Sequence, residues 1–276
     1  MSNPVCWLAS YPKSGNTWVR FLLHQYFFGR AERSLEIAST LPDVHGHSGE
    51  LVGRPVETRS GPVTLAKTHH RCSPTMPFAA QSARAIYIAR HPRDVMWSCL
   101  NYAKIVCAPE VATRITARGY AKNYIHLGGD PQFIQIGYGS LIEHASSWLR
   151  EPQVPVLLVR YEDLRRDTSR GLAEMVAFLG ARVDEAEIER SVENSSFERM
   201  RAIEEADVAS GEADRVFAAR PTARAEGRRF MNAGTLGRSL DEIAPGMDVD
   251  LEARFRSYLD LTGYERSAAS TERSTT

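Results

Sequence analysis

Short apolar runs alternate along the chain with longer segments in which apolar residues recur at helical spacing. The runs are bounded by turn formers or charges and are rich in β-branched or aromatic residues, which is typical of buried strands. They span residues 5–9, 62–66, 85–89 and 154–159. The helical segments are 16–28, 94–103, 140–149 and 169–179. This alternation predicts a three-layer α/β/α fold with a mostly parallel central sheet.

Three other segments follow neither pattern. Residues 104–139 have no strong period and hold several aromatic residues and glycines, which predicts an irregular insertion. Residues 202–229 are rich in Ala, Glu and Arg with charges on every turn, which predicts a solvent-facing helix with mobile ends. Residues 266–276 are mostly Ser, Thr, Ala and charged residues. They are expected to form a disordered tail, which leaves 1–265 as a single domain.

Composition and charge narrow the class of protein. The chain has 276 residues, 43% hydrophobic and 25% charged, as in a folded protein rather than a disordered or fibrous one. Its 34 basic and 34 acidic residues balance, so no overall field attracts nucleic acid or an anionic membrane, and any anion site must be local. The four cysteines lack metal-binding spacing, and the sequence has neither a leader pattern nor an apolar stretch of roughly 18 residues. We therefore expect a cytoplasmic protein without a membrane span; its oligomeric state stays open.

The loop after the first predicted strand has the composition of an anion site. It reads Tyr-Pro-Lys-Ser-Gly-Asn over residues 11–16 and opens a helix, whose N-terminal N–H groups favour negative charge. Lys13 adds a full charge, and Gly15 lets the backbone approach a ligand closely. An ordinary capped turn uses similar residues, so the loop alone leaves both interpretations open. The lysine precedes the glycine, unlike in a Walker A loop, which disfavours a magnesium-dependent kinase.

Extended through Thr17 and Trp18, the same octapeptide resembles the 5′-phosphosulfate loop of sulfotransferases that use 3′-phosphoadenosine 5′-phosphosulfate (PAPS). The resemblance continues in order over roughly 5–237: a strand ends at Arg90 with a serine eight residues later, and a further strand leads into Tyr161-Glu162-Asp163. It implies a P-loop-like sulfotransferase fold, with PAPS as co-substrate and 3′-phosphoadenosine 5′-phosphate (PAP) as product. The nucleotide contacts that it implies are Lys13, Ser14, Gly15, Asn16, Thr17, Trp18, Arg90, Ser98, Tyr161, Ser195, Phe197, Asn232 and Gly234.

The segment Lys67-Thr68-His69 resembles the part of the family that carries the catalytic base. His69 follows a predicted strand, at the edge where open α/β sheets bind ligands, and an imidazole suits proton transfer near neutral pH. His70 beside it stays an alternative. A cation on the departing phosphate oxygen stabilises the transition state, which suits Lys13, while Lys67 is the candidate to hold the moving sulfonate. These lysines and the loop amides supply the positive field, so no metal is expected.

One departure from the family lies near the C-terminus. The family has an Arg-Lys-Gly segment that closes over the 3′-phosphate, whereas residues 232–234 here are Asn-Ala-Gly. Either donor binding is weaker, or Arg228, Arg229 or Arg238 supplies the charge. The loss of two cations also supports an alternative, a catalytically weak or inactive nucleotide-binding relative.

The acceptor is expected to be a small molecule with a hydroxyl group. Its pocket would be built by residues 69–78, 104–139 and 202–229, because loops carry specificity in such folds. Five aromatic residues in or near these segments favour an apolar or aromatic acceptor: Tyr102, Tyr120, Tyr124, Phe133 and Tyr138.

Overall fold

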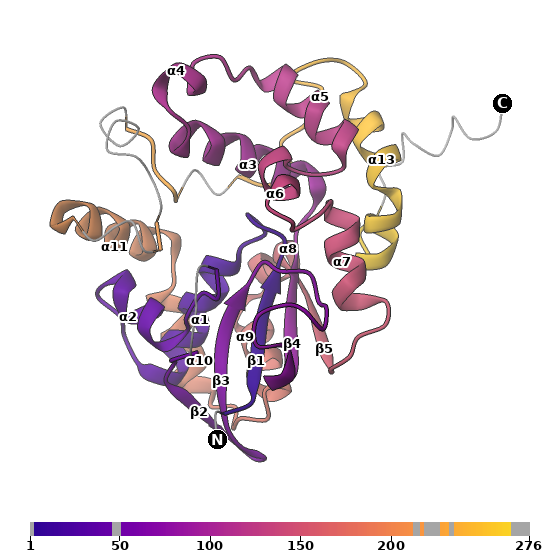
Figure 1. Ribbon diagram of the computed structural model, residues 1–276. Helices are drawn as coiled ribbons and strands as arrows, with labels where there is room; N and C mark the ends of the chain where they lie inside the picture. The colour runs from indigo at the N-terminus through magenta and orange to yellow at the C-terminus, as the bar shows by residue number, and fades with distance from the viewer. Residues whose placement is uncertain (1–2, 46–50, 212–215, 218–226, 232–234, 266–276) are drawn as a thin grey trace.

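The computed structural model describes residues 3–45, 51–211, 216–217, 227–231 and 235–265. Within them, five strands form one sheet in the order β2-β3-β1-β4-β5 (Figure 1). The strands are β1 (Val5–Ser10), β2 (Pro55–Thr58), β3 (Gly61–Thr68), β4 (Ser82–Ala89) and β5 (Val156–Arg160). All neighbours pair in parallel except β2, which runs antiparallel to β3 at one edge. The predicted mostly parallel sheet is confirmed.

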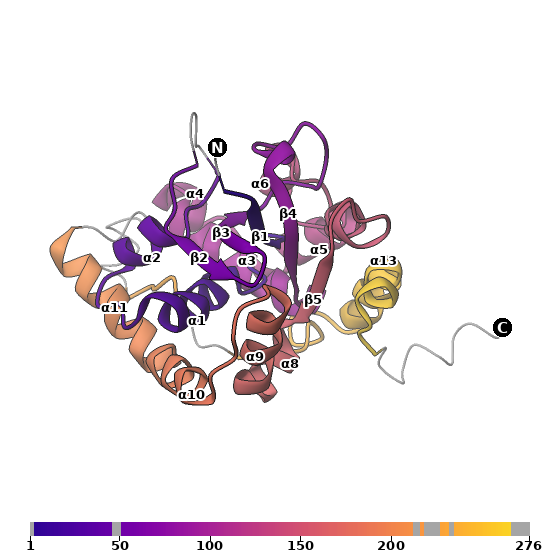
Figure 2. The same ribbon diagram turned by 90° about the horizontal axis from the view of Figure 1, so that it is seen from below.

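Alternate side chains of β1 pack into two separate hydrophobic cores, one on each face of the sheet. Cys6 and Leu8 point to one face, while Val5, Trp7 and Ala9 point to the other. The first face is covered by α1 (Asn16–Phe28), α9 (Thr168–Phe178) and α10 (Glu185–Asn194). The second is covered by α3 (Pro92–Val106), α5 (Ala117–Leu127), α7 (Leu141–Leu149) and α13 (Met247–Thr262). Figure 2 shows α9 and α13 on opposite sides of the sheet, and the predicted three-layer α/β/α architecture is confirmed.

Two expectations from the sequence were wrong or incomplete. Residues 104–139 are largely helical: they hold the end of α3, then α4 (Pro109–Ala112), α5 and α6 (Pro131–Gln135). Their period was weak because the helices are short and α5 buries only Ala121 and Tyr124. Strand β2 was missed because it is a short edge strand that buries only Val56.

Helix α11 (Phe197–Ser210) covers the start of the expected solvent-facing helix and is capped by Gly211. It is not fully solvated, since Met200, Ile203, Glu204 and Asp207 are buried. The remaining elements in the described part of the chain are α2 (Ser34–Thr40), η1 (Ala79–Gln81) and α8 (Tyr161–Arg166). The tail 266–276 lies outside the described residues, and the single domain over 1–265 stays a prediction. Among the helices described, none has the length and apolar character that crossing a membrane requires.

The register of the sheet brings the predicted site segments to one edge. Ala9 of β1 lies beside Thr68 of β3 and Tyr87 of β4, and Ala89 of β4 lies beside Arg160 of β5. The parallel strands therefore end close together, and the residues that follow each of them emerge at the same carboxyl edge. In Figure 1 the parallel strands β1, β3, β4 and β5 run upward, and α3, α4, α5 and α6 lie above their ends.

Candidate functional site

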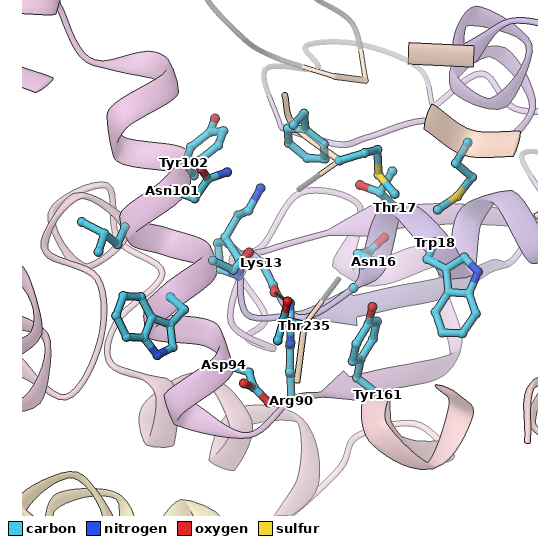
Figure 3. Close-up of a pocket in the computed structure, with 18 of the residues that line it drawn as sticks. Lys13, Asn16, Thr17, Trp18, Arg90, Asp94, Asn101, Tyr102, Tyr161 and Thr235 are labelled. Atoms are coloured by element: carbon cyan, nitrogen blue, oxygen red, sulfur yellow. Dashed lines mark hydrogen bonds between the residues drawn. The ribbon is translucent and has the colours of Figure 1, made fainter. Parts of the chain in front are cut away.

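A cavity of about 1300 Å³ lies at the carboxyl edge of the sheet (Figure 3). Of the predicted site residues that the structure describes, all but Ser14 line it: Lys13, Gly15, Asn16, Thr17, Trp18, Lys67, His69, Arg90, Ser98, Tyr161, Ser195 and Phe197. The Ser14 side chain is buried, and its N–H donates to the Tyr11 carbonyl at 3.3 Å. Asn232 and Gly234 lie outside the described residues.

The loop between β1 and α1 turns sharply through two left-handed residues. Lys13 has φ 70° and Gly15 has φ 102°. The Asn16 amide donates to the Leu8 carbonyl at 2.8 Å and to Ser10 Oγ at 3.1 Å, which ties the start of α1 to β1. Gly15 has no room for a side chain, because a Cβ there would lie 2.4 Å from Cδ2 of Tyr161. The loop backbone is therefore fixed against the ring that follows β5.

We expect Gly15→Ala to lower the free energy of unfolding by about 2 kcal/mol or more, because it adds both backbone strain and a clash with Tyr161. Gly246→Ala is the matched control: Gly246 also precedes a helix in the left-handed region, with φ 82°, but no atom lies within 4 Å of its added Cβ. It should cost only the strain, about 1 kcal/mol. Denaturant unfolding measures both, and equal losses would contradict the steric argument.

The Lys13 ammonium lies in an aromatic cage formed by Tyr102 and Phe230. Its Nζ is 4.4 Å from the centre of the Tyr102 ring and 3.8 Å from that of Phe230. The buried Glu204 carboxylate holds Phe230 by accepting its N–H at 2.7 Å. Burial lowers the pKa of Lys13 to about 7, with nearby Lys67 and Arg90 adding to the shift and Glu204 opposing it. Figure 3 shows Lys13 extending toward Tyr102.

Arg90 lies between the loop that carries Lys13 and the first residue of α8. Its Nη1 donates to the Lys13 carbonyl at 3.1 Å, and its guanidinium carbon is 4.6 Å from the centre of the Tyr161 ring. Arg90 Nε is buried and, like Asn16 Oδ1 and Ser195 Oγ in the same cavity lining, has no hydrogen-bond partner among the described residues. Buried polar atoms normally have partners, so the cavity lining fits a polar ligand that supplies them.

Three of the predicted nucleotide contacts lie on the α1 side of the cavity: Trp18, Ser195 and Phe197. Trp18 Nε1 donates to the Ser195 carbonyl at 3.0 Å, and its ring meets Tyr161 edge to face at 5.6 Å between centres. Phe197 begins α11 and lines the same wall. These aromatic surfaces and the unpartnered Ser195 hydroxyl offer stacking and polar contacts to a planar base.

His69 lines the cavity, and one of its ring nitrogens is held by the backbone of β1. Its Nδ1 lies 2.7 Å from the Ser10 carbonyl, which accepts only, so Nδ1 carries the proton and Nε2 is free to act as a base. The His69 carbonyl accepts from His144 Nε2 at 3.0 Å, and His144 Nδ1 in turn accepts from the Tyr87 hydroxyl. Burial, followed by the charge of Lys67, holds the pKa of His69 well below its usual value. His70 does not line the cavity.

Lys67 is paired with an acid that the sequence did not single out. Its Nζ lies 2.5 Å from Asp43 Oδ2, and both side chains line the cavity beside His69. Burial raises the pKa of Asp43, but Lys67, His69 and Arg20 outweigh that effect and lower it overall. Asp43 is therefore an anion, and it partly neutralises the lysine next to the candidate base.

Only some of the residues predicted to form the acceptor pocket line the cavity. Tyr102, Phe133 and Tyr138 line the cavity, whereas Tyr120 and Tyr124 do not: their hydroxyls bond Asp130 and the Pro92 carbonyl. Of segment 69–78, only His69 lines it. The described residues hold no group of three or more His, Cys, Asp or Glu side chains that could bind a metal ion.

Two of the three arginines that could replace the missing cations line the cavity: Arg228 and Arg238 do, and Arg229 does not. Arg165 of α8 also lines it, and the sequence did not single it out. Sequence reasoning also missed Glu204. Its signal was the stripe formed with Met200, Ile203 and Asp207, which recurs at helical spacing and indicates a buried face.

The chain resembles known sulfotransferases in sequence. It is 26% identical to human Sulfotransferase 1E1 over 209 residues, which cover 70% of this chain and 65% of that protein. It is 29% identical to rat Sulfotransferase 1A1 over 206 residues, covering 70% and 66%. The matches therefore span slightly less than two thirds of the length of these relatives.

Solved structures share the fold. A mouse sulfotransferase, SULT7A1, complexed with PAP, superposes with a TM-score of 0.63 at 19% identity, covering 94% of this chain and 86% of that one. Retinol dehydratase in complex with retinol and PAP gives the same TM-score and identity, covering 97% and 84%. The family model described as the sulfotransferase domain matches residues 3–263. Because that match spans nearly the whole chain, the resemblance seen in the sequence is confirmed: the chain belongs to the sulfotransferase family.

Proposed function

We propose that this protein transfers a sulfonate group from PAPS to a hydroxyl of a small-molecule acceptor, with His69 as general base and without a metal. The observation that carries the proposal is the pairing of Lys13 and Arg90. Both side chains line one cavity, and Arg90 Nη1 donates to the Lys13 carbonyl. Lys13 belongs to the left-handed loop after β1, and Arg90 follows β4. Two cations in one cavity suit a ligand that carries more than one anionic group.

Three sets of residues would each bind one part of the donor. Lys13, the loop amides and Thr17 would hold the 5′-phosphosulfate at the start of α1. Arg90 and Ser98 would hold the 3′-phosphate, using the unpartnered Arg90 Nε. The adenine would lie against the wall formed by Trp18, Ser195 and Phe197, where the Ser195 hydroxyl has no partner among the described residues.

In the reaction, His69 Nε2 accepts the proton of the acceptor hydroxyl as its oxygen bonds to sulfur. The bond between sulfur and the bridging phosphate oxygen breaks, and the electron pair stays on that oxygen. The Lys13 ammonium stabilises the charge there, where a cation binds the transition state more tightly than the ground state. Lys67, kept near His69 by Asp43, offers its remaining N–H groups to the sulfonate.

Tyr102, Phe133 and Tyr138 support an apolar or aromatic acceptor, because they line the cavity that His69 also lines. The Tyr138 ring centre is 6.0 Å from that of His69, and its hydroxyl lies 2.6 Å from His45 Nδ1. A flat acceptor against this wall would bring a hydroxyl group to the base.

Calorimetry with PAP, combined with transfer of labelled sulfonate from PAPS to a panel of phenols, alcohols, amines and glycans, tests the proposal. Binding together with transfer supports it. Binding without transfer or donor hydrolysis would identify the alternative, an inactive nucleotide-binding relative, which the missing cations at 232–233 favour. Absence of PAP binding would overturn both.

We expect Arg238→Gln to weaken PAP binding by about tenfold, as for loss of one charge-assisted hydrogen bond, with little effect on adenosine 5′-monophosphate (AMP). The Arg238 guanidinium lies over the Trp97 ring at 3.9 Å, next to Ser98, and would replace a missing loop cation. Arg228→Gln tests the other cavity arginine, and Arg229→Gln is the control because Arg229 does not line the cavity. If all three variants bind PAP like the wild type, the compensation idea is wrong.

A further inference from the structure

The Tyr258 hydroxyl of α13 makes two hydrogen bonds with the backbone of Arg90. Its side chain is buried, and its hydroxyl donates to the Arg90 carbonyl at 3.0 Å and accepts from the Arg90 N–H at 3.3 Å. Strand β4 ends at Ala89 and α3 begins at Pro92, so Arg90 lies between the sheet and the helix. One tyrosine thus satisfies both main-chain polar groups of a residue that follows its strand.

The residues on either side of Arg90 are held in a similar way. The Tyr264 hydroxyl, just beyond the end of α13, shares its one proton between the Ala89 carbonyl, at 3.3 Å, and Glu162 Oε2. The His91 N–H donates to Glu162 Oε1 at 3.0 Å, and Tyr264 also bonds the other oxygen of that carboxylate. Three consecutive residues are therefore fixed by α13, the turn after it, and α8.

The Arg90 side chain starts from this fixed backbone and reaches the cavity with little freedom. Its Nη1 is bonded to the Lys13 carbonyl and its guanidinium lies against Tyr161, which leaves the buried Nε without a partner among the described residues. A guanidinium that meets a phosphate through two hydrogen bonds needs such accurate placement. The sequence at 232–233 lacks the two cations of the family segment, so Arg90 has a larger share of the charge to supply.

We propose that Tyr258 is a positioning residue for recognition of the donor's 3′-phosphate, acting through the backbone of Arg90. The inference rests on the proposed function, in which Arg90 binds that phosphate. It assigns a part in donor selectivity to the C-terminal helix, which does not line the cavity between Met247 and Thr262.

Tyr258→Phe removes the hydroxyl and keeps the ring. We expect the affinity for PAP to fall by about tenfold, because an unanchored Arg90 loses alignment with the phosphate. The affinity for AMP, which lacks the 3′-phosphate, should change by less than about twofold. Calorimetry with both nucleotides gives the ratio of the two dissociation constants, which a general loss of stability would not change. In an Arg90→Gln background, Tyr258→Phe should not weaken PAP binding further.

Tyr124→Phe is the matched control. Tyr124 of α5 is also fully buried, and its ring stacks on that of Phe255 in α13, at 5.4 Å between centres. Its hydroxyl donates to the Pro92 carbonyl rather than to Arg90. It should leave the PAP to AMP ratio unchanged. Tyr264→Phe is a second test that does not depend on the folding of the first variant. It should shift the ratio in the same direction by about threefold, a smaller effect because its hydroxyl bonds Ala89 and Glu162 rather than Arg90 itself.

The outcomes separate the inference from the proposed function. If the wild type does not bind PAP more tightly than AMP, the role proposed for Arg90 fails, and the inference fails with it. If the wild type discriminates but neither Tyr258→Phe nor Tyr264→Phe changes the ratio, the inference alone is overturned. Equal weakening of PAP and AMP binding would overturn it too, since that pattern indicates a purely structural role.

Discussion

His69→Ala is expected to lower the turnover number by about 10²–10⁴-fold while PAP affinity changes by less than about threefold. The loss follows from removing Nε2, the ring nitrogen that remains free when Nδ1 donates to the Ser10 carbonyl. The nucleotide contacts lie elsewhere in the cavity, so binding should survive. Added imidazole should restore part of the activity, because it supplies a base of the same chemistry to the vacated space.

His70→Ala is the matched control for this prediction. His70 is the next residue and contacts the same Tyr138 ring, at 5.5 Å between centres, but it does not line the cavity. Its variant should retain most of the activity. If instead His70→Ala abolishes turnover and His69→Ala does not, the base has been assigned to the wrong histidine. The pKa of His69 is lowered, so the neutral base should persist as pH falls through 6.5, with activity declining only at more acidic pH.

Lys13→Met should lower the turnover number by about 10²–10³-fold, comparable to removal of one donor from an oxyanion hole, and should also weaken donor binding. The methionine side chain still fills the space between Tyr102 and Phe230, so the cage should remain packed. Lys104→Met removes a charge from the same cavity but outside that cage, and it should cost less than about tenfold. Single-turnover kinetics at saturating donor separates the chemical step from binding, and similar losses in the two variants would contradict the role given to Lys13.

The same lysine gives donor binding a pH dependence of known sign. The pKa of Lys13 is about 7 without a donor, so the ammonium is present below pH 7 and is lost as pH rises through that value. An anionic ligand raises the pKa of a nearby amine, and wild-type protein should therefore take up nearly one proton on binding PAP at about pH 8. Calorimetry in buffers of different ionisation enthalpy measures this uptake. Lys13→Met should show none, and proton uptake by the variant would assign it to another group.

Much of the candidate site could be predicted because it consists of short segments that follow buried strands. The loop at Lys13, the segment at His69, Arg90 and Tyr161 each come directly after an apolar run, and parallel strands end at one edge. Their shared presence in one cavity thus followed from the hydrophobic pattern together with the order of the motifs. The antiparallel strand β2 and the helices within 104–139 were missed, since short, half-exposed elements carry little periodic signal.

Local patterns and motif order were enough to predict the alternation of strands and helices, the family, and the residues that end each strand. Three pairings emerge only from the folded chain: Asp43 with Lys67, Glu204 with the backbone of Phe230 beside Lys13, and Tyr258 with the backbone of Arg90. The partners in each pair are far apart in the chain. Their contacts depend on how helices and loops pack around the sheet, and neither hydrophobic period nor local composition encodes that packing.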